Sequence, residues 1–146
     1  MKKIDFIEDK NYEVWQSDSI VYTPPFKLMF ECYLEILHKG WTSDIMPWRN
    51  SSLVIWIESL EKEVLGGICY DFVSDRKEGW INFTFTSPNY RKIGINSLCY
   101  KYFEQECIKK GMSAISGVIA VDNVVALNSA KKAGRTPEFY RVSKKL

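Results

Sequence analysis

The residues with the clearest chemical potential lie in one basic loop, residues 90–96, with the sequence YRKIGIN. A run rich in β-branched and aromatic side chains, residues 80–86, precedes this loop, and a helical pattern follows it. The first backbone N–H groups of a helix lack partners inside the helix and lie at the positive end of its dipole. Arg91 and Lys92 add full charges, and Gly94 lets a ligand approach the backbone closely. The pattern predicts a binding site for a phosphate or pyrophosphate group.

A second polar position follows the next apolar run, residues 115–121. Asn123 stands between that run and a helical pattern, residues 124–133, which Gly134 ends. An Asn at this place can accept a hydrogen bond from the first turn of the helix as its N-cap. It can also face a ligand that lies along the neighbouring strand end, and the two roles do not exclude each other.

The spacing of the basic loop matches neither the G-x-G-x-x-G of a dinucleotide fold nor a P-loop. It resembles the pyrophosphate loop of the GNAT superfamily of N-acetyltransferases, which has Gln or Arg, then Gly three residues later, then Gly or Ala after two more. Arg91, Gly94 and Asn96 stand at these three positions, and Pro88 and Tyr90 also fit the family pattern. Asn96 departs from it, and its carboxamide either donates to a phosphate oxygen or narrows the loop.

The segment around Asn123 resembles the second signature of the same family. Asn123, Ala126 and Gly134 stand at the expected spacings. Two positions depart from the pattern. Ala130 stands where many members carry a tyrosine that protonates the departing thiolate, and Arg135 stands where Phe is usual.

The resemblance implies that acetyl-CoA binds as the acyl donor substrate, with no metal. In the family, the strand before the basic loop splays from its parallel neighbour, so that free backbone groups hold the pantetheine arm and polarise the thioester carbonyl. The residues expected to bind the donor are Phe85, Thr86, Arg91, Lys92, Ile93, Gly94, Ile95, Asn96 and Asn123.

No side chain is assigned a catalytic role from the sequence. The strand that carries the base in many family members offers Asn82 and Thr84, and neither is a base. Glu78 precedes that strand in a charged turn, where solvation is the usual state of a carboxylate. The hydroxyl groups that could replace the missing tyrosine are Ser129, Tyr90 and Tyr140. Acyl transfer can also proceed without an acid, because a thiolate with a pKa of ~8.5 is a fair leaving group.

Composition describes one globular domain, residues 1–146, with 46% hydrophobic and 26% charged residues. The net charge of +2 is too small to indicate nucleic-acid or membrane-surface binding. No apolar run approaches the ~20 residues of a membrane span, and the start of the chain lacks the pattern of a secretory signal.

The four cysteines form no C-x-x-C pair, and the sole histidine, His38, has no set of zinc partners. We therefore expect reduced, mostly buried thiols at Cys32, Cys69, Cys99 and Cys107, no metal, and a cytoplasmic protein.

Hydrophobic periodicity predicts the elements that must hold these residues. The expected strands are 3–6, 13–15, 53–60, 64–73, 80–86, 115–121 and 138–142, with a short β-prone segment at 20–22. The expected helices are 26–38, 95–110 and 124–133, with one further turn at 44–48. Gly66 and Gly67 interrupt the strand 64–73, so we expect a bulge or a close backbone neighbour there.

This order predicts an α/β (α+β) fold of the GNAT type. An antiparallel meander leads into a parallel strand pair that splays at the donor site, with helices on both faces of a mixed sheet. The predicted function is an N-acetyltransferase in which an amine attacks acetyl-CoA directly in a ternary complex. The alternative is a catalytically degenerate GNAT fold that binds acyl-CoA or a protein partner. The sequence leaves two acceptors possible, an amine-bearing small molecule or a protein. It leaves two oligomeric states possible, a monomer or a homodimer.

Overall fold

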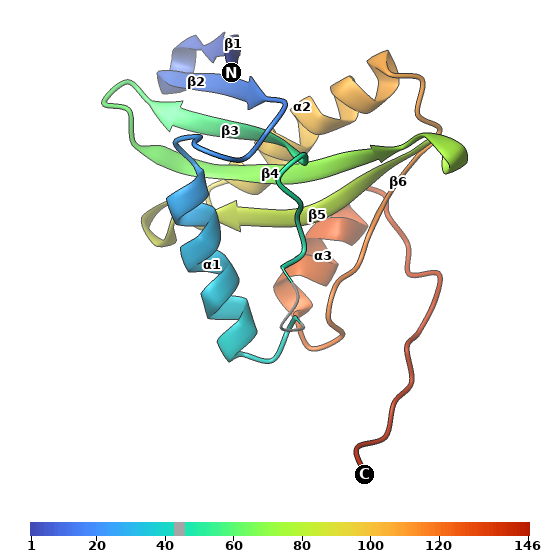
Figure 1. Cartoon of the computed structure of the whole chain (residues 1–146). Coiled ribbons are helices and arrows are strands. Elements are labelled where there is room, and N and C mark those ends of the chain that lie inside the picture. Colours follow the sequence, from blue (N-terminus) through green and yellow to red (C-terminus); the bar gives the residue numbers. More distant parts are fainter. Residues whose placement is uncertain (43–45) are drawn as a thin grey trace.

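Six strands form one mixed sheet whose spatial order follows the chain, β1-β2-β3-β4-β5-β6 (Figure 1). The computed structural model describes residues 1–42 and 46–146. The strands are β1 (Lys2–Ile7), β2 (Tyr12–Ser17), β3 (Leu53–Ser59), β4 (Val64–Val73), β5 (Glu78–Thr86) and β6 (Ala114–Gly117). Neighbouring strands pair antiparallel from β1 to β5, and β6 pairs parallel with β5. The expected meander followed by a parallel pair is confirmed.

Helices cover both faces of this sheet (Figure 1). They are α1 (Phe26–His38), α2 (Ile95–Lys109) and α3 (Val124–Lys132). Three short 3-10 helices lie at Glu8–Lys10, Ser74–Arg76 and Pro88–Tyr90. On one face Met29 and Tyr33 of α1 pack on Trp56 of β3, and on the other Cys99 and Phe103 of α2 pack on β3 and β4. The sheet is thus the middle layer between two hydrophobic cores.

A β-bulge in β5 changes which face its side chains meet. Cys69 pairs with Phe83, but the next residue of β4, Tyr70, pairs with Ile81, so that Asn82 is the extra residue. Ile81 belongs to the core under α2, whereas Phe83 and Phe85 belong to the core under α1. Without the bulge, strict alternation would put all three side chains on one face.

The expected irregularity at Gly66 and Gly67 is confirmed. The pairing of β3 with β4 shifts register there. A Cβ on Gly66 would lie 2.7 Å from the Phe85 carbonyl oxygen, and one on Gly67 would lie 2.5 Å from the Phe85 ring. These two positions need glycine because β5 lies closely across β4.

Two expected strands are shorter or absent in the structure. The strand predicted at residues 115–121 spans only Ala114–Gly117, and the following Val118 is exposed. The segment 138–142 is neither helix nor strand, and the Phe139 side chain is 90% exposed. Both segments have strand-like composition, but a strand also needs a partner edge within hydrogen-bonding distance.

The other elements differ from expectation mainly in length. Residues 3–6 and 13–15 extend into a hairpin of β1 and β2, and β5 begins at Glu78. The segment 20–22 is a turn in which Ile20 is buried and its carbonyl accepts hydrogen bonds from Thr23. The helical turn expected at residues 44–48 falls partly on residues 43–45, which lie outside the described part of the chain.

Candidate functional site

The pairing of β5 with β6 ends before β5 does. The paired residues run from Glu78 with Ala114 to Ile81 with Gly117, and β5 continues to Thr86. In the described part of the chain, no strand pairs with the β6-side edge of residues 82–86. Backbone N–H and C=O groups on that edge have no strand partner and can pair with a ligand, except the Thr86 carbonyl, which already accepts from Arg91 and Cys32.

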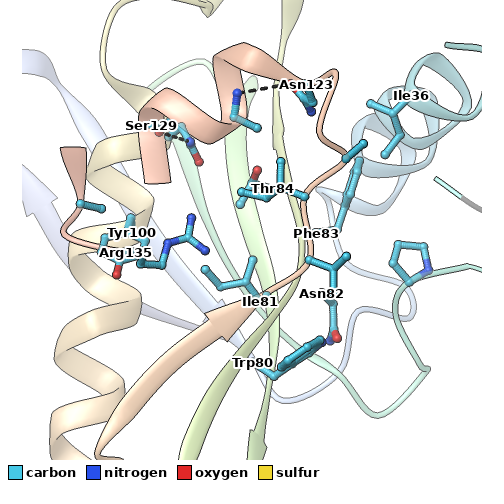
Figure 2. Close-up of a pocket in the computed structure, with 18 of the residues that line it drawn as sticks. Ile36, Trp80, Ile81, Asn82, Phe83, Thr84, Tyr100, Asn123, Ser129 and Arg135 are labelled. Atoms are coloured by element: carbon cyan, nitrogen blue, oxygen red, sulfur yellow. Dashed lines mark hydrogen bonds between the residues drawn. The ribbon is translucent and has the colours of Figure 1, made fainter. Parts of the chain in front are cut away.

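A cavity of about 1130 Å³ lies at this divergence (Figure 2). Its lining includes Ile36 of α1 and Gly40 just after that helix, residues 80–84 of β5, and Asn96 and Tyr100 of α2. It therefore draws on helices from both faces of the sheet. A second cavity, of about 940 Å³, adjoins it beside β6 and shares Tyr100 and Arg135 with it.

The basic loop places the start of α2 next to this cavity. Gly94 adopts a left-handed conformation with φ +91° immediately before Ile95, and Lys92 also has positive φ. No side chain caps α2, so its first amides keep the open donors that the sequence predicted. Arg91, Lys92, Ile93 and Gly94 are exposed, and the cavity reaches this segment at Asn96.

Arg91 is engaged by α1. Its Nη1 and Nη2 donate to the two carboxylate oxygens of Glu35 at 2.9 and 2.8 Å, and its Nε donates to the Thr86 carbonyl at 3.2 Å. The Arg91 guanidinium lowers the pKa of Glu35 to about 2. Arg91 thus ties the basic loop to α1, a partnership between residues 56 positions apart that the sequence pattern did not indicate.

Asn96 and Asn123 are both directed towards α3. Asn96 Nδ2 donates to Ser129 Oγ at 3.2 Å, while Asn96 Oδ1 is buried without a hydrogen-bond partner among the described residues. Asn123 Oδ1 accepts from the Ala126 amide at 3.2 Å, which confirms the N-cap role. Both residues line the cavity, and Figure 2 shows Asn123 and Ser129 on α3 at its edge.

The two strand residues expected at the donor site, Phe85 and Thr86, do not present side chains to the cavity. Phe85 is 3% exposed in the core under α1, and the Thr86 carbonyl accepts from Arg91 and from Cys32 Sγ. Phe83 and Thr84 line the cavity instead. Phe83 and Phe85 belong to the same core, so the difference is one of position along β5: the cavity follows residues 80–84, next to the end of the pairing with β6.

An acidic side chain that the sequence did not single out lies beside the bulge. Asp71 Oδ2 accepts from Asn82 Nδ2 at 2.7 Å and from Ser52 Oγ at 3.1 Å, and Arg49 Nη2 is 3.6 Å away. Asp71 and Asn82 belong to the neighbouring strands β4 and β5, so only the strand pairing brings them together. The Asp71 carboxylate therefore lies directly behind the Asn82 side chain in the cavity wall.

The other acid and base candidates lie elsewhere. Glu78 accepts from Arg76 at 2.8 Å, and the Ser116 hydroxyl and then Arg76 lower its pKa. Tyr90 donates to Glu63 at 2.7 Å and is not part of the cavity lining. Tyr140 is exposed in the segment after α3. Of the three hydroxyl candidates only Ser129 lines the cavity.

The four cysteines are all free and buried, as expected. Burial raises the pKa of the Cys69 and Cys99 thiols to about 12 and that of Cys107 to about 11. Burial also raises the pKa of Cys32. A thiol held protonated is a poor nucleophile and a poor metal ligand. No group of three or more His, Cys, Asp or Glu gathers within residues 1–42 and 46–146.

Comparisons with known proteins agree with this architecture. The sequence model of the "Acetyltransferase (GNAT) family" matches residues 22–134. A comparison with curated proteins found no match. None of the helices in the described ranges could span a membrane.

Several solved structures have the same fold. An aminoglycoside acetyltransferase from an uncultured soil metagenomic sample has a TM-score of 0.68 and 15% identity, covering 94% of this chain and 97% of its own. A mutant of a Bacillus halodurans protein has a TM-score of 0.71 and 13% identity, covering 91% and 98%. An acetyltransferase from Trypanosoma brucei has a TM-score of 0.62 and 10% identity, covering 93% and 100%.

Proposed function

Because the chain belongs to the acetyltransferase (GNAT) family, we propose that it transfers an acetyl group from acetyl-CoA to an amine by direct attack in a ternary complex. The observation that carries this proposal is the cavity at the divergence of β5 and β6, which is lined from both faces of the sheet. Such a cavity lets the donor and the acceptor meet from opposite faces, so both can be bound at once.

The donor is proposed to lie on the α2 and α3 side. Its pyrophosphate would bind the uncapped amides of residues 92–96, with Lys92 adding a charge that has no ion-pair partner among the described residues. Its pantetheine arm would lie along the free edge of residues 82–86. The buried, unpartnered Asn96 Oδ1 fits an amide N–H of that arm, since a buried acceptor without a partner is costly.

Direct attack is favoured over a covalent acyl-enzyme. A two-step route through the protein would need an activated nucleophile near the thioester. All four thiols are buried with raised pKa values, and none of them lines the cavity at the divergence. The acceptor amine itself is then the nucleophile.

The acceptor is proposed to enter on the α1 side. There the cavity is lined by Ile36, Trp41 and Pro47 and by Trp80 and Asn82 of β5. Asp71 is paired with Arg49 at 3.6 Å and accepts from Asn82 Nδ2, so it holds the Asn82 carboxamide in place, and the oxygen of that carboxamide can accept a hydrogen bond from an amine. The aminoglycoside acetyltransferase among the similar structures acts on an acceptor of that kind, which supports an amine-bearing small molecule here.

Two measurements test the proposal in sequence. Calorimetry with millimolar acetyl-CoA should detect binding, and a panel of amines should then be scored for thiol release. Absence of any heat would refute the donor assignment. Binding without thiol release for any amine would favour the alternative, a fold that retains acyl-CoA binding and has lost catalysis.

A further inference from the structure

The end of α3 directs Arg135 back towards the cavity. Gly134 has φ +82°, its amide bonds the Lys131 carbonyl at 3.0 Å, and the Arg135 amide bonds the Ala130 carbonyl at 3.0 Å. These two bonds define a Schellman motif, in which the residue at the Arg135 position usually makes an apolar contact with the last turn of the helix. Here that position carries a cation.

The guanidinium group lies at the base of the strand divergence. Its central carbon is 5.5 Å from the centre of the Tyr100 ring, and its Nη1 is 3.7 Å from where a Cβ on Gly117 would stand. Gly117 and Ile81 are the last paired residues of β6 and β5. Figure 2 shows Arg135 beside Tyr100 and reaching towards Ile81, and Arg135 lines both cavities.

This cation has no anionic partner in the described part of the chain. Its Nε is buried without a hydrogen-bond acceptor, and no described carboxylate lies within ion-pair distance. Burial lowers the Arg135 pKa, but an arginine remains charged in a protein. A partly buried, unpaired cation is costly, which indicates a site that is completed by an anion. The other charged and titratable groups of the main cavity are Tyr100, Lys101, Glu104, Lys132 and Arg141.

The chemistry proposed above produces an anion at this place. A donor arm that enters from the basic loop runs along residues 82–86, so its thioester end reaches the base of the divergence. As the amine nitrogen attacks the carbonyl carbon, a C–N bond forms and the C–S bond breaks. The sulfur leaves with the bonding electron pair as a thiolate, and the proton of the amine passes to water. The resulting acetamide and thiolate balance the reaction.

We infer that Arg135 supplies the positive charge that stabilises this departing thiolate, in place of the tyrosine hydroxyl that Ala130 lacks. The inference rests on the proposed function. Because a thiolate is already a fair leaving group, a fixed cation can assist its departure without donating a proton. Ala130 is small and buried at the end of α3, which leaves room for the arginine stem beside it.

The test measures the thiol of bound CoA, the reaction product, and does not depend on turnover. The ultraviolet absorbance of the thiolate, followed against pH, gives the pKa of the CoA thiol in the complex. In the wild type this pKa should lie below that of free CoA. Arg135→Gln should raise it by about one unit or more, a tenfold change in ionisation. Arg135→Lys should restore part of the shift, and Lys110→Gln, at an exposed cation outside both cavities, should leave it unchanged.

Turnover gives the second readout. Arg135→Gln should lower kcat on the order of 10²-fold, the loss typical of removing one preorganised group that stabilises developing charge, with a smaller change in KM for acetyl-CoA. CoA that binds both wild type and Arg135→Gln with the same thiol pKa would overturn the inference and leave the proposed function intact. Failure of the wild type to bind CoA at all would overturn both.

The Tyr100→Phe variant distinguishes stabilisation by the Arg135 charge from proton donation by the Tyr100 hydroxyl. Burial raises the Tyr100 pKa, and the ring lies under the guanidinium. If Arg135 acts by charge alone, Tyr100→Phe should keep most of the turnover and the same pH profile. A large loss of kcat in Tyr100→Phe, together with the disappearance of a descending alkaline limb, would assign the role to Tyr100 and overturn the inference. Melting curves of each variant verify that it is folded.

Discussion

At the scale of single residues, two polar groups with incomplete hydrogen bonding mark the cavity. Asn96 Oδ1 and Arg135 Nε are the buried side-chain atoms without partners in the described ranges. Native proteins rarely leave such groups unsatisfied, and exceptions often have a functional explanation. One atom is an acceptor and the other a donor, and both side chains line the cavity at the divergence.

Asn96 offers a test with a matched control. In Asn96→Ala the unpartnered Oδ1 is lost together with the bond to Ser129, whereas Ser129→Ala removes only that bond. If the arm of acetyl-CoA donates to Oδ1, Asn96→Ala should weaken acetyl-CoA binding by about 1 kcal/mol, roughly fivefold, and Ser129→Ala by less. Calorimetry on both variants measures the difference. Tighter binding by Asn96→Ala would instead support crowding of the loop by this side chain.

At the scale of elements, the basic loop is held between two helices. Arg91 binds Glu35 of α1, and Asn96 binds Ser129 of α3. The loop amides that are proposed to hold the pyrophosphate therefore depend on both neighbours for their position. The Arg91 side chain fixes this loop to α1, because three of its five N–H donors already bind Glu35 and the Thr86 carbonyl.

The Arg91–Glu35 pair predicts a specific pH dependence of stability. The folded-state pKa of Glu35, about 2, lies below its ordinary value of 4.5, so the pair stabilises the fold above that ordinary value and ceases to do so as pH falls towards 2. Glu35→Gln should lower Tm slightly at neutral pH, and the difference from wild type should shrink between about pH 4.5 and 2. The effect is small because both side chains are more than a third exposed.

Glu31→Gln, one turn earlier on α1, is the matched control. Glu31 pairs with Lys27 at 3.9 Å on an open surface, so its loss should leave Tm nearly unchanged at every pH. Melting curves followed by circular dichroism in buffers from low to neutral pH measure both variants. Equal Tm values for Glu31→Gln and Glu35→Gln at neutral pH would contradict a structural role for the Arg91–Glu35 pair.

At the scale of the whole molecule, the sheet supplies both a rigid layer and the opening at its β6 edge. Within the described residues, neighbouring strands pair from β1 to β5 with bulges at three places, and β5 extends beyond its pairing with β6. Cores lie on both faces of the paired part, so the opening is bordered by well-packed structure. A ligand that fills the opening would join the α2 and α3 side to the α1 side.

Ligand binding to the folded state should therefore raise Tm. At a free concentration 100 times Kd, acetyl-CoA adds about 2.7 kcal/mol to the free energy of unfolding, which for a domain of this size corresponds to roughly 5–11 °C. Acetyl-pantetheine, which lacks the pyrophosphate, should give a smaller shift at the same concentration. Thermal shift assays compare the two ligands. Equal shifts would argue against pyrophosphate binding at the loop amides.

Much of this protein could be predicted from sequence because the signals are local. The apolar spacing of residues 26–38 predicted α1 to the residue, and Val64–Val73 was likewise confirmed as β4. The open helix start after Gly94 and the N-cap at Asn123 also follow from a few neighbouring residues, and both are present. Hydrophobic periodicity, turn residues and caps act over one or two helical turns, so the chain itself determines them.

Tertiary structure alone decided the features that depend on distant partners. The bulge at Asn82 is defined by the pairing of β5 with β4. The position of the Arg91 side chain is defined by the Glu35 carboxylate on α1. Segment 138–142 has the composition of a strand but meets no partner edge, so it forms none. In the sequence, Arg135 is only a departure from the family's second signature. In the structure, the end of α3 directs its side chain towards the place where β5 and β6 diverge. Hydrogen bonds and charge pairs between residues far apart in the chain exist only after packing has brought them together, and no local pattern encodes that geometry.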